Sequence, residues 1–271
     1  MPIHSLKANR INSPLIMGVL NVTPDSFSDG GQYLSPLTAI DHAFKMIDEG
    51  ADIIDIGGES TRPGAEAISI DEEKNRIIPV IKELRKHSQA YLSIDTYKPE
   101  VMQVAIELGV DMINDITAMT SHDALGVIKN SEVDISLMHM QGNPSNMQIN
   151  PHYKSVADEV YDFLNERANF CIAAGIEKER IVIDPGFGFG KTHNDNMILF
   201  QNIKRFADLD LPVLIGVSRK SMIKKMVGDN MDDIIDASSF YAALAARNGA
   251  SILRVHDCLL YTSDAADDGL S

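Results

Sequence analysis

Short runs of mainly apolar residues recur along the chain, and polar residues gather where these runs end. Eight runs begin at Leu15, Asp52, Tyr91, Met112, Ile135, Ile181, Pro212 and Ser251. None of them alternates cleanly between apolar and polar positions. Apolar, β-branched runs of this length are typical of strands covered on both faces, as parallel strands are. The pattern therefore predicts eight buried parallel strands.

Helical spacing of apolar residues fills most of the segments between these runs. It is clearest over residues 37–47, 101–108, 156–164 and 234–244, and the helices would end near Gly50, Gly109, Gly175 and Gly249. Only a short helix near residues 123–129 fits after the fourth run. The alternation predicts a (β/α)8 TIM barrel with residues 1–271 as a single domain. The alternative is a doubly wound open sheet, but no Gly-x-Gly-x-x-Gly follows the first run.

Charge and composition narrow the class of protein. The chain has 271 residues and a formal net charge of -15, so we expect no nucleic-acid partner. An anionic small ligand stays compatible, because a few local basic residues can bind it. No apolar run approaches about 18 residues, which predicts no membrane partner and a cytoplasmic location. Cys171 and Cys258 show no metal-type spacing and fit a reducing compartment.

Each predicted strand ends in polar chemistry. The first residues of this kind are Asn21, Asp55, Asp95, Asn114, His139, Asp184, Ser218 and Arg254. Active sites of barrels form at the C-terminal ends of the strands. Polar groups at all eight ends would be costly to bury without partners, so we predict a shared polar ligand.

The residue types indicate a ligand with two chemical ends. Asp95, Asn114 and Asp184 offer acceptors to a flat donor edge, such as the N–H pair of a 2-amino-4-oxo heterocycle. Lys220 would donate a hydrogen bond to the carbonyl or to a nitrogen of that ring. The basic side chains suit an anion such as phosphate. They are Arg62, Arg254 and His256. We therefore expect a nitrogenous ring deep in the barrel and an anion nearer the rim.

The run DPGFGFGKT nearly imitates a phosphate-binding Walker A loop. That pattern requires glycine where this chain has Pro185, so we reject the interpretation. The glycines of the run instead permit a tight loop that presents Phe187 or Phe189.

Seven motifs in order resemble one enzyme family over about residues 15–257. They are NVTPDSFSDGG, DIGGESTRPGA, SIDT, ND, DPGFGFGK, GVSRKSM and RVHD. The chain resembles the dihydropteroate synthases of folate biosynthesis. The resemblance implies a transferase that condenses 6-hydroxymethyl-7,8-dihydropterin pyrophosphate with p-aminobenzoate, giving 7,8-dihydropteroate and pyrophosphate, with Mg2+. It also implies a homodimer and a sulfonamide target.

The same resemblance implies roles for individual residues. The pterin would be held by Asp95, Asn114, Met138, Asp184, Gly216, Lys220 and Arg254. The pyrophosphate would be held by Asn21, Arg62, Arg254 and His256, with Asn21 also meeting the metal. The p-aminobenzoate pocket would consist of Phe27, Thr61, Pro63, Phe189 and Ser221. The catalytic residues would be Asp29, Arg62 and Lys220.

Two polar loops, residues 23–31 and 59–64, are then predicted to be lids that close over the site and exclude water. Asp29 would pair with Arg62 or orient the amine. The alternative is that the acidic and serine residues of the first loop only form turns. Asp55 either braces Asn21 and Arg62 or satisfies backbone groups beneath the site.

The chain departs from the family pattern after RVHD. Residues 258–271 read CLLYTSDAADDGLS, where an amphipathic helix would normally close the barrel. This predicts an abnormal or truncated final helix and places the homodimer in question. Two other functions stay open: a pterin-dependent methyltransferase, which would not need STRP, SRKS and RVH together, and a catalytically inactive pterin-binding paralogue.

Overall fold

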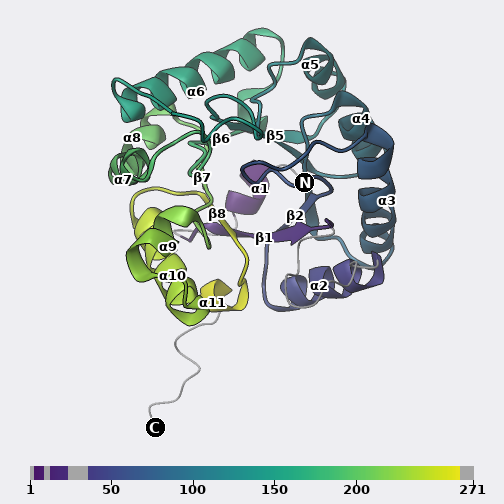
Figure 1. Cartoon of the computed structure of the whole chain (residues 1–271). Coiled ribbons are helices and arrows are strands. Elements are labelled where there is room, and N and C mark those ends of the chain that lie inside the picture. Colours follow the sequence, from purple (N-terminus) through teal and green to yellow (C-terminus); the bar gives the residue numbers. More distant parts are fainter. Residues whose placement is uncertain (1–2, 9–12, 24–35, 263–271) are drawn as a thin grey trace.

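Eight parallel strands form the centre of the molecule in the computed structural model, which describes residues 3–8, 13–23 and 36–262 (Figure 1). The strands are β1 Leu15–Asn21, β2 Ile53–Gly57, β3 Tyr91–Asp95, β4 Met112–Asp115, β5 Asp134–Met138, β6 Ile181–Asp184, β7 Leu214–Ile215 and β8 Ile252–Val255. Their order is β6-β5-β4-β3-β2-β1-β8-β7. A bridge between Ile183 and Val213 joins the two edges. The sheet closes as a (β/α)8 barrel, and the open-sheet alternative is wrong.

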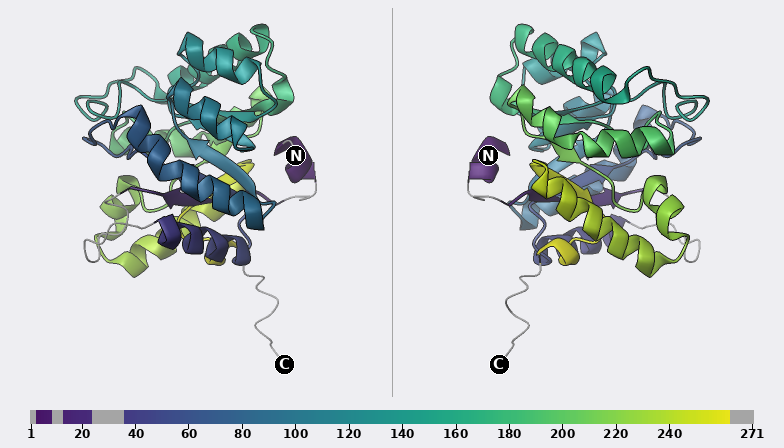
Figure 2. Two further views of the ribbon diagram at one scale, coloured as in Figure 1. Left: turned by 90° about the vertical axis from the view of Figure 1, so that its right-hand side faces the viewer. Right: turned by 90° about the vertical axis from the view of Figure 1, so that its left-hand side faces the viewer.

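Helices surround the barrel and cover its outer face (Figures 1 and 2). They are α1 Ile3–Ala8, α2 Pro36–Asp48, α3 Ile70–His87, α4 Pro99–Glu107, α5 His122–Lys129, α6 Val156–Ala173, α7 His193–Gln201, α8 Ile203–Phe206, α9 Ser221–Val227, α10 Met231–Arg247 and α11 Leu259–Thr262, with 3-10 turns η1 Lys178–Arg180 and η2 Ala207–Leu209. The predicted helices are confirmed as α2, α4, α5, α6 and α10. The pattern did not single out α3, which is rich in charge and contains Pro79.

The interior of the barrel changes from apolar to polar along the strands. Near their N-terminal ends the inward side chains form one apolar cluster that includes Met17, Ile53, Met112, Val182, Leu214 and Ile252. Side chains two residues apart share a face of a strand. The next inward positions are therefore Asp55, Asn114, Asp184, Gly216 and Arg254. One end of the barrel is an apolar core, and the other is a polar mouth.

Helix α1 closes the apolar end and lies over the centre of the barrel in Figure 1. Ile3 is 1% exposed and packs against the apolar cluster. Its amide donates to Asp134 Oδ2 at 2.6 Å, and the Tyr91 hydroxyl donates to the same oxygen. Burial disfavours the charged form and raises the pKa of both side chains.

The last described element is short. Helix α11 has four residues, and Thr262 Oγ1 donates to the Glu49 carbonyl at the end of α2. A Cβ on Gly18 would lie 2.9 Å from Cys258 Sγ, so this segment packs closely on β1. Within the described residues, β8 is thus followed by a single helical turn. The abnormal or truncated final helix stays a prediction, because residues 263–271 lie outside the described residues.

Candidate active site

The polar residues predicted from the strand ends converge at the mouth of the barrel. The alignment of β2, β3 and β4 pairs Gly57 with Asp95 and Asp95 with Asn114. The alignment of β5 and β6 pairs Met138 with Asp184. Paired residues of parallel strands lie at one level and share a face of the sheet. The four side chains that form the floor of the site are all buried. They are Asp95, Asn114, Met138 and Asp184.

Arg254 on β8 crosses this floor and joins two carboxylates. Its Nε donates to Asp55 Oδ2 at 2.7 Å, and its Nη2 donates to Asp95 Oδ2 at 3.0 Å. Burial would lower the pKa of Arg254, but the two carboxylates outweigh burial and raise it. Asp55 Oδ2 also accepts from Asn114 Nδ2 at 3.3 Å. Asp55 therefore braces Arg254 and Asn114, two partners that the sequence interpretation did not name.

Several buried acceptors of the floor have no hydrogen-bond partner within the described protein. They include Asp95 Oδ1 and Asn114 Oδ1. A buried acceptor without a donor costs roughly 1–3 kcal/mol, so such atoms indicate a ligand that supplies donors. Burial also raises the pKa of Asp95 to about 7, which Arg254 opposes. The floor is therefore adapted to receive N–H groups.

Lys220 lies above the floor beside the loop that follows β6. Its Nζ donates to the Phe187 carbonyl and lies 4.9 Å from the centroid of the Phe189 ring. Burial lowers the pKa of Lys220 to about 8, although Asp184 favours its charged form. A Cβ on Gly216 would lie 3.9 Å from Lys220 Nζ, so glycine keeps this space open. Phe187 is buried in the core, and Phe189 is the aromatic residue presented to the site.

Basic side chains surround His256 at the rim. Its Nδ1 lies 3.1 Å from Ser218 Oγ. Burial and the neighbouring charges of Arg254, Arg219 and Arg62 lower the pKa of His256 to about 3. His256 is therefore neutral at physiological pH, and the cations around it make the rim electropositive. Arg62 and Arg254 are thus among the cations whose charge acts on His256, and the anion site stays a prediction.

The predicted p-aminobenzoate and catalytic residues are only partly described. Phe27 and Asp29 lie outside the described residues, so their roles stay predictions. Thr61 is half-buried and Pro63 is exposed on the loop between β2 and α3, and Ser221 is exposed at the start of α9. These three residues stand at the edge of the mouth, where a second substrate would enter.

Comparison with known proteins gives this geometry a family. Residues 17–256 match the family described as pterin binding enzyme. The dihydropteroate synthase of Haemophilus influenzae is 46% identical over 254 residues, covering 94% of this chain and 92% of that protein. The chain belongs to the dihydropteroate synthase family.

Solved dihydropteroate synthases share the fold. The Xanthomonas albilineans structure with 4-aminobenzoic acid has a TM-score of 0.86 at 45% identity, covering 92% of this chain and 89% of that chain. The Yersinia pestis structure in a sulfonamide drug complex has a TM-score of 0.88 at 40% identity, covering 93% and 91%. These comparisons confirm the resemblance, the barrel fold and the transferase class predicted from the dihydropteroate synthase motifs.

The interpretation of the sequence assigned no role to Lys191, a buried residue of this dihydropteroate synthase fold. Lys191 is 3% exposed, and its Nζ donates to the carbonyls of Gly186 at 2.8 Å and Phe189 at 3.0 Å. It also lies 2.9 Å from His139 Nδ1. Burial lowers the pKa of Lys191 to about 7. Lys191 holds the loop after β6 in shape, and its position directly after the glycine-rich run was the available signal.

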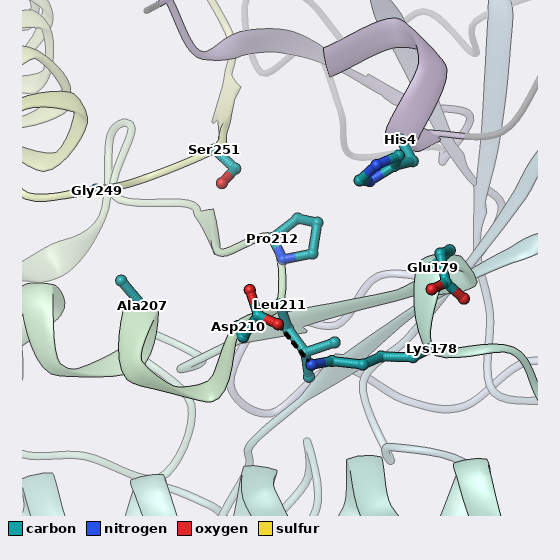
Figure 3. A pocket seen from close by; sticks show the side chains of 9 residues that line it. All are labelled: His4, Lys178, Glu179, Ala207, Asp210, Leu211, Pro212, Gly249 and Ser251. Atoms are coloured by element: carbon teal, nitrogen blue, oxygen red, sulfur yellow. Dashed lines mark hydrogen bonds and ion pairs between the residues drawn. The ribbon is translucent and has the colours of Figure 1, made fainter. Parts of the chain in front are cut away.

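Two hollows of the molecule are candidate ligand sites. A hollow of about 450 Å³ lies at the N-terminal ends of the strands, lined by Lys178, Asp210 and Ser251 among others (Figure 3). Its ion pair of Lys178 with Asp210 is exposed to solvent. A hollow of about 290 Å³ opens at the mouth and includes Met138 and Ile116. The second hollow is lined by one predicted pterin residue, Met138, whereas the first lies at the closed end of the dihydropteroate synthase barrel.

Proposed function

We propose that the chain condenses 6-hydroxymethyl-7,8-dihydropterin pyrophosphate with p-aminobenzoate to give 7,8-dihydropteroate and pyrophosphate. The C–O bond to pyrophosphate breaks, the arylamine nitrogen bonds to the same methylene carbon, and the amine loses a proton. The observation that carries this proposal is the pair of buried acceptors without protein donors, Asp95 Oδ1 and Asn114 Oδ1. The names of the relatives support the same reaction.

The floor of the mouth binds the pterin in this proposal. Asp95, Asn114 and Asp184 accept from the ring N–H groups, while Lys220 donates to the ring carbonyl or a ring nitrogen. Arg254 is held by two carboxylates and borders the ring from β8. Met138 supplies apolar contact beside Asp184, and Gly216 leaves room between the two cations. A ring that satisfies the buried acceptors explains why they are tolerated.

The electropositive rim binds the pyrophosphate. Arg62, Arg254 and His256 surround the position where an anion leaves, and the depressed pKa of His256 is a sign of that positive field. His256 would donate as a neutral imidazole, and the two guanidinium groups would supply charge. Stabilising negative charge as it develops on the leaving group favours C–O cleavage.

Mg2+ binding is proposed at Asn21, and the residues fit a single protein ligand. No group of three or more His, Cys, Asp or Glu that could hold a metal occurs in the described part of the chain. Mg2+ commonly takes few protein oxygens and is completed by phosphates and water. The half-buried Asn21 ends β1 in register with Gly57, whose added Cβ would lie 3.5 Å from Asn21 Oδ1. When bound, Mg2+ would neutralise charge on the pyrophosphate.

The aryl substrate binds above the pterin, between the loops. Phe189 is positioned by Lys220 and Lys191 and forms one wall of the proposed p-aminobenzoate pocket. Thr61, Pro63, Ser221 and Phe27 would complete that pocket. Exclusion of water would leave the arylamine as the only nucleophile at a loose, cation-like transition state. Arg62 would stabilise the leaving group, Lys220 would hold the ring, and Asp29 would orient the amine.

A homodimer, a cytoplasmic location and sulfonamide binding belong to the same proposal. Phe240 on α10 is 61% exposed, which gives one late helix an apolar side chain that a second copy could cover. Among the described residues, no helix combines the length and apolar character needed to cross a membrane. Sulfonamide binding is supported by the drug complex of the Yersinia pestis relative.

The test is to supply both substrates with Mg2+ and to measure pyrophosphate and dihydropteroate together. Equal release of both products is the expected result, with inhibition by a sulfonamide that p-aminobenzoate relieves. Asp95→Asn replaces a required acceptor with an amide of the same shape and should lose at least tenfold in kcat/KM for the pterin. A folded chain that binds the pterin but releases neither product would instead identify a non-catalytic paralogue. Methyl transfer from a methylated pterin would identify the methyltransferase.

A further inference from the structure

A buried ionic cluster lies beneath the loop between β2 and α3. Lys98 Nζ lies 2.6 Å from Glu59 Oε2 and 2.7 Å from Glu73 Oε2. The Tyr97 hydroxyl donates to Glu59 Oε1 at 2.8 Å. The exposed fractions are 11% for the Lys98 side chain, 7% for Glu59 and 1% for Glu73. We name Lys98, Glu59, Glu73 and Tyr97 the Lys98 cluster.

The Lys98 cluster joins the two ends of one loop. Glu59 precedes the loop, and its Oε2 accepts from the Ile68 amide at 2.9 Å. Lys98 Nζ donates to the Ile68 carbonyl at 2.8 Å. Both backbone groups of Ile68 are thus bound by the cluster, nine residues after Glu59. The cluster determines the separation and orientation of the two ends of residues 60–67.

The loop carries predicted substrate residues, while its base alone is buried. Arg62 and Pro63 are exposed, and Thr61 is half-buried. Near the tip, the Gly64 amide donates to the Pro144 carbonyl at 3.1 Å, and the Ala65 amide donates to the Arg62 carbonyl at 3.0 Å. A change at the base is therefore transmitted to the substrate residues through a short length of chain.

The charges of the Lys98 cluster persist at neutral pH. Burial would raise the pKa of Glu59, but hydrogen bonds from Lys98, the Ile68 amide and Tyr97 outweigh burial and lower it. Burial would lower the pKa of Lys98, but Glu59 and Glu73 outweigh burial and raise it. Removing the single cation would leave two carboxylates close together in a buried site, which strongly disfavours the closed base.

From this geometry we infer that Lys98, Glu59 and Tyr97 are positioning residues for the p-aminobenzoate site. They act through the loop that carries Thr61, Arg62 and Pro63, and none of them is assigned a contact with either substrate. The inference rests on the proposed function and identifies which part of the fold prepares the second substrate site. Disturbing the Lys98 cluster should weaken p-aminobenzoate binding and leave the pterin on its floor of Asp95 and Asn114.

The test compares Lys98→Met with Arg85→Met. Arg85 lies near the opposite end of α3, where it pairs with Asp111 and donates to the Ala90 carbonyl at 2.6 Å. Each variant removes one partly buried cation. Arg85 lies on α3, and Lys98 pairs with Glu73 of α3. Lys98→Met should raise KM for p-aminobenzoate at least tenfold. It should leave the Kd of 6-hydroxymethyl-7,8-dihydropterin, which lacks the pyrophosphate assigned to Arg62, within about twofold. Arg85→Met should leave both constants unchanged while lowering Tm.

A milder variant and a second readout complete the test. Tyr97→Phe removes one hydroxyl from Glu59 and should raise the same KM two- to fivefold, which covers the case in which Lys98→Met does not fold. Backbone hydrogen exchange over residues 60–69 should accelerate in Lys98→Met and not in Arg85→Met. Unchanged KM and exchange in both cluster variants, or equal losses of affinity for p-aminobenzoate and for the pterin without pyrophosphate, would overturn the inference.

The same data separate this inference from the proposed function. A wild-type chain that forms no dihydropteroate contradicts the proposed function. The exchange measurement does not need turnover. If the chain shows no turnover, the Kd of p-aminobenzoate, measured with the pterin pyrophosphate present, replaces its KM. Faster exchange of the loop without any change in p-aminobenzoate binding would leave Lys98 with a structural role only and would overturn the inference.

Discussion

Two buried lysines support two loops at the mouth of this barrel, and they do so by opposite means. Lys98 meets the carboxylates of Glu59 and Glu73 beneath the loop between β2 and α3. Lys191 meets carbonyl oxygens and the His139 ring beneath the loop between β6 and α7. The first lysine has carboxylates as direct partners, and the direct partners of the second carry no charge.

The surroundings give the two ammonium groups opposite protonation behaviour. Contacts with carboxylates outweigh burial and raise the pKa of Lys98, whereas burial lowers the pKa of Lys191 to about 7. Carbonyl dipoles satisfy hydrogen bonds but compensate charge less than carboxylates do. The comparison teaches that a lysine with carboxylate partners stays charged, whereas a more deeply buried lysine with carbonyl partners titrates near neutrality.

The largest expected effect comes from glycines of the two loops. Gly186 has φ +68°, and an added Cβ would overlap the His139 carbonyl oxygen. Gly64 has φ +80° but nothing within 4 Å of an added Cβ. Gly186→Ala should therefore lower the free energy of unfolding by about 3 kcal/mol or more, since overpacking and strain add. Gly64→Ala should cost about 1 kcal/mol, from strain alone.

Chemical denaturation of both glycine variants, with pterin affinity measured in parallel, checks this difference. The amide of Gly186 donates to Asp184 Oδ1 at 2.7 Å, so displacement of this backbone should also weaken pterin binding. Equal losses of stability at Gly186 and Gly64 would show that the loop after β6 is no more tightly packed than the loop after β2.

The pH dependence of stability should separate the two lysines. The folded pKa of Lys191 lies near 7, below the unfolded value of about 10.4, so the unfolded chain binds more protons between these values. Stability of the wild type relative to Lys191→Met should therefore rise from pH 7 to pH 9, by at most about 1.4 kcal/mol per pH unit. The same difference for Lys98→Met should be flat, because Lys98 stays charged. Parallel curves for the two variants would contradict the comparison.

The affinity of the floor for the pterin should depend on pH below about 7, whereas the contribution of Lys191 to stability changes above about 7. Asp95 must be ionised to accept from the pterin, and burial raises its pKa to about 7. Affinity for the pterin should fall up to tenfold per pH unit below about pH 7 and level off above it. Titration calorimetry from pH 5.5 to 8.5 measures this. Asp95→Asn should bind weakly with no such slope, and a slope retained in that variant would assign it to another group.

The smallest effect is expected at an exposed lysine. Lys178 Nζ lies 2.8 Å from Asp210 Oδ2, with exposed fractions of 42% and 92%. Solvent screens such pairs, so Lys178→Met should leave Tm and both substrate constants unchanged. Thermal unfolding beside Lys98→Met and Lys191→Met provides the measurement. A loss of stability comparable with that of either buried lysine would show that burial is not the deciding factor.

The sequence by itself determined the elements and the residue types at the mouth. Apolar runs and helical spacing identified all eight strands and five helices, because those patterns depend on local periodicity. Polar residues at the strand ends predicted the floor, since parallel strands place their C-terminal ends together. The family motifs then predicted roles for the same residues. Helix α3 was not singled out because its sequence is mainly charged and interrupted by Pro79.

The tertiary structure alone decided which of these residues meet. The pairing of β8 with β1 brings Arg254 within reach of Asp55, 199 residues away in the chain. Lys98 and Lys191 look alike in the sequence. The packing of distant elements supplies carboxylates to Lys98, whereas Lys191 meets carbonyl oxygens of its own loop and the distant His139 ring. Charge state depends on burial and on partners in space, neither of which local sequence periodicity encodes.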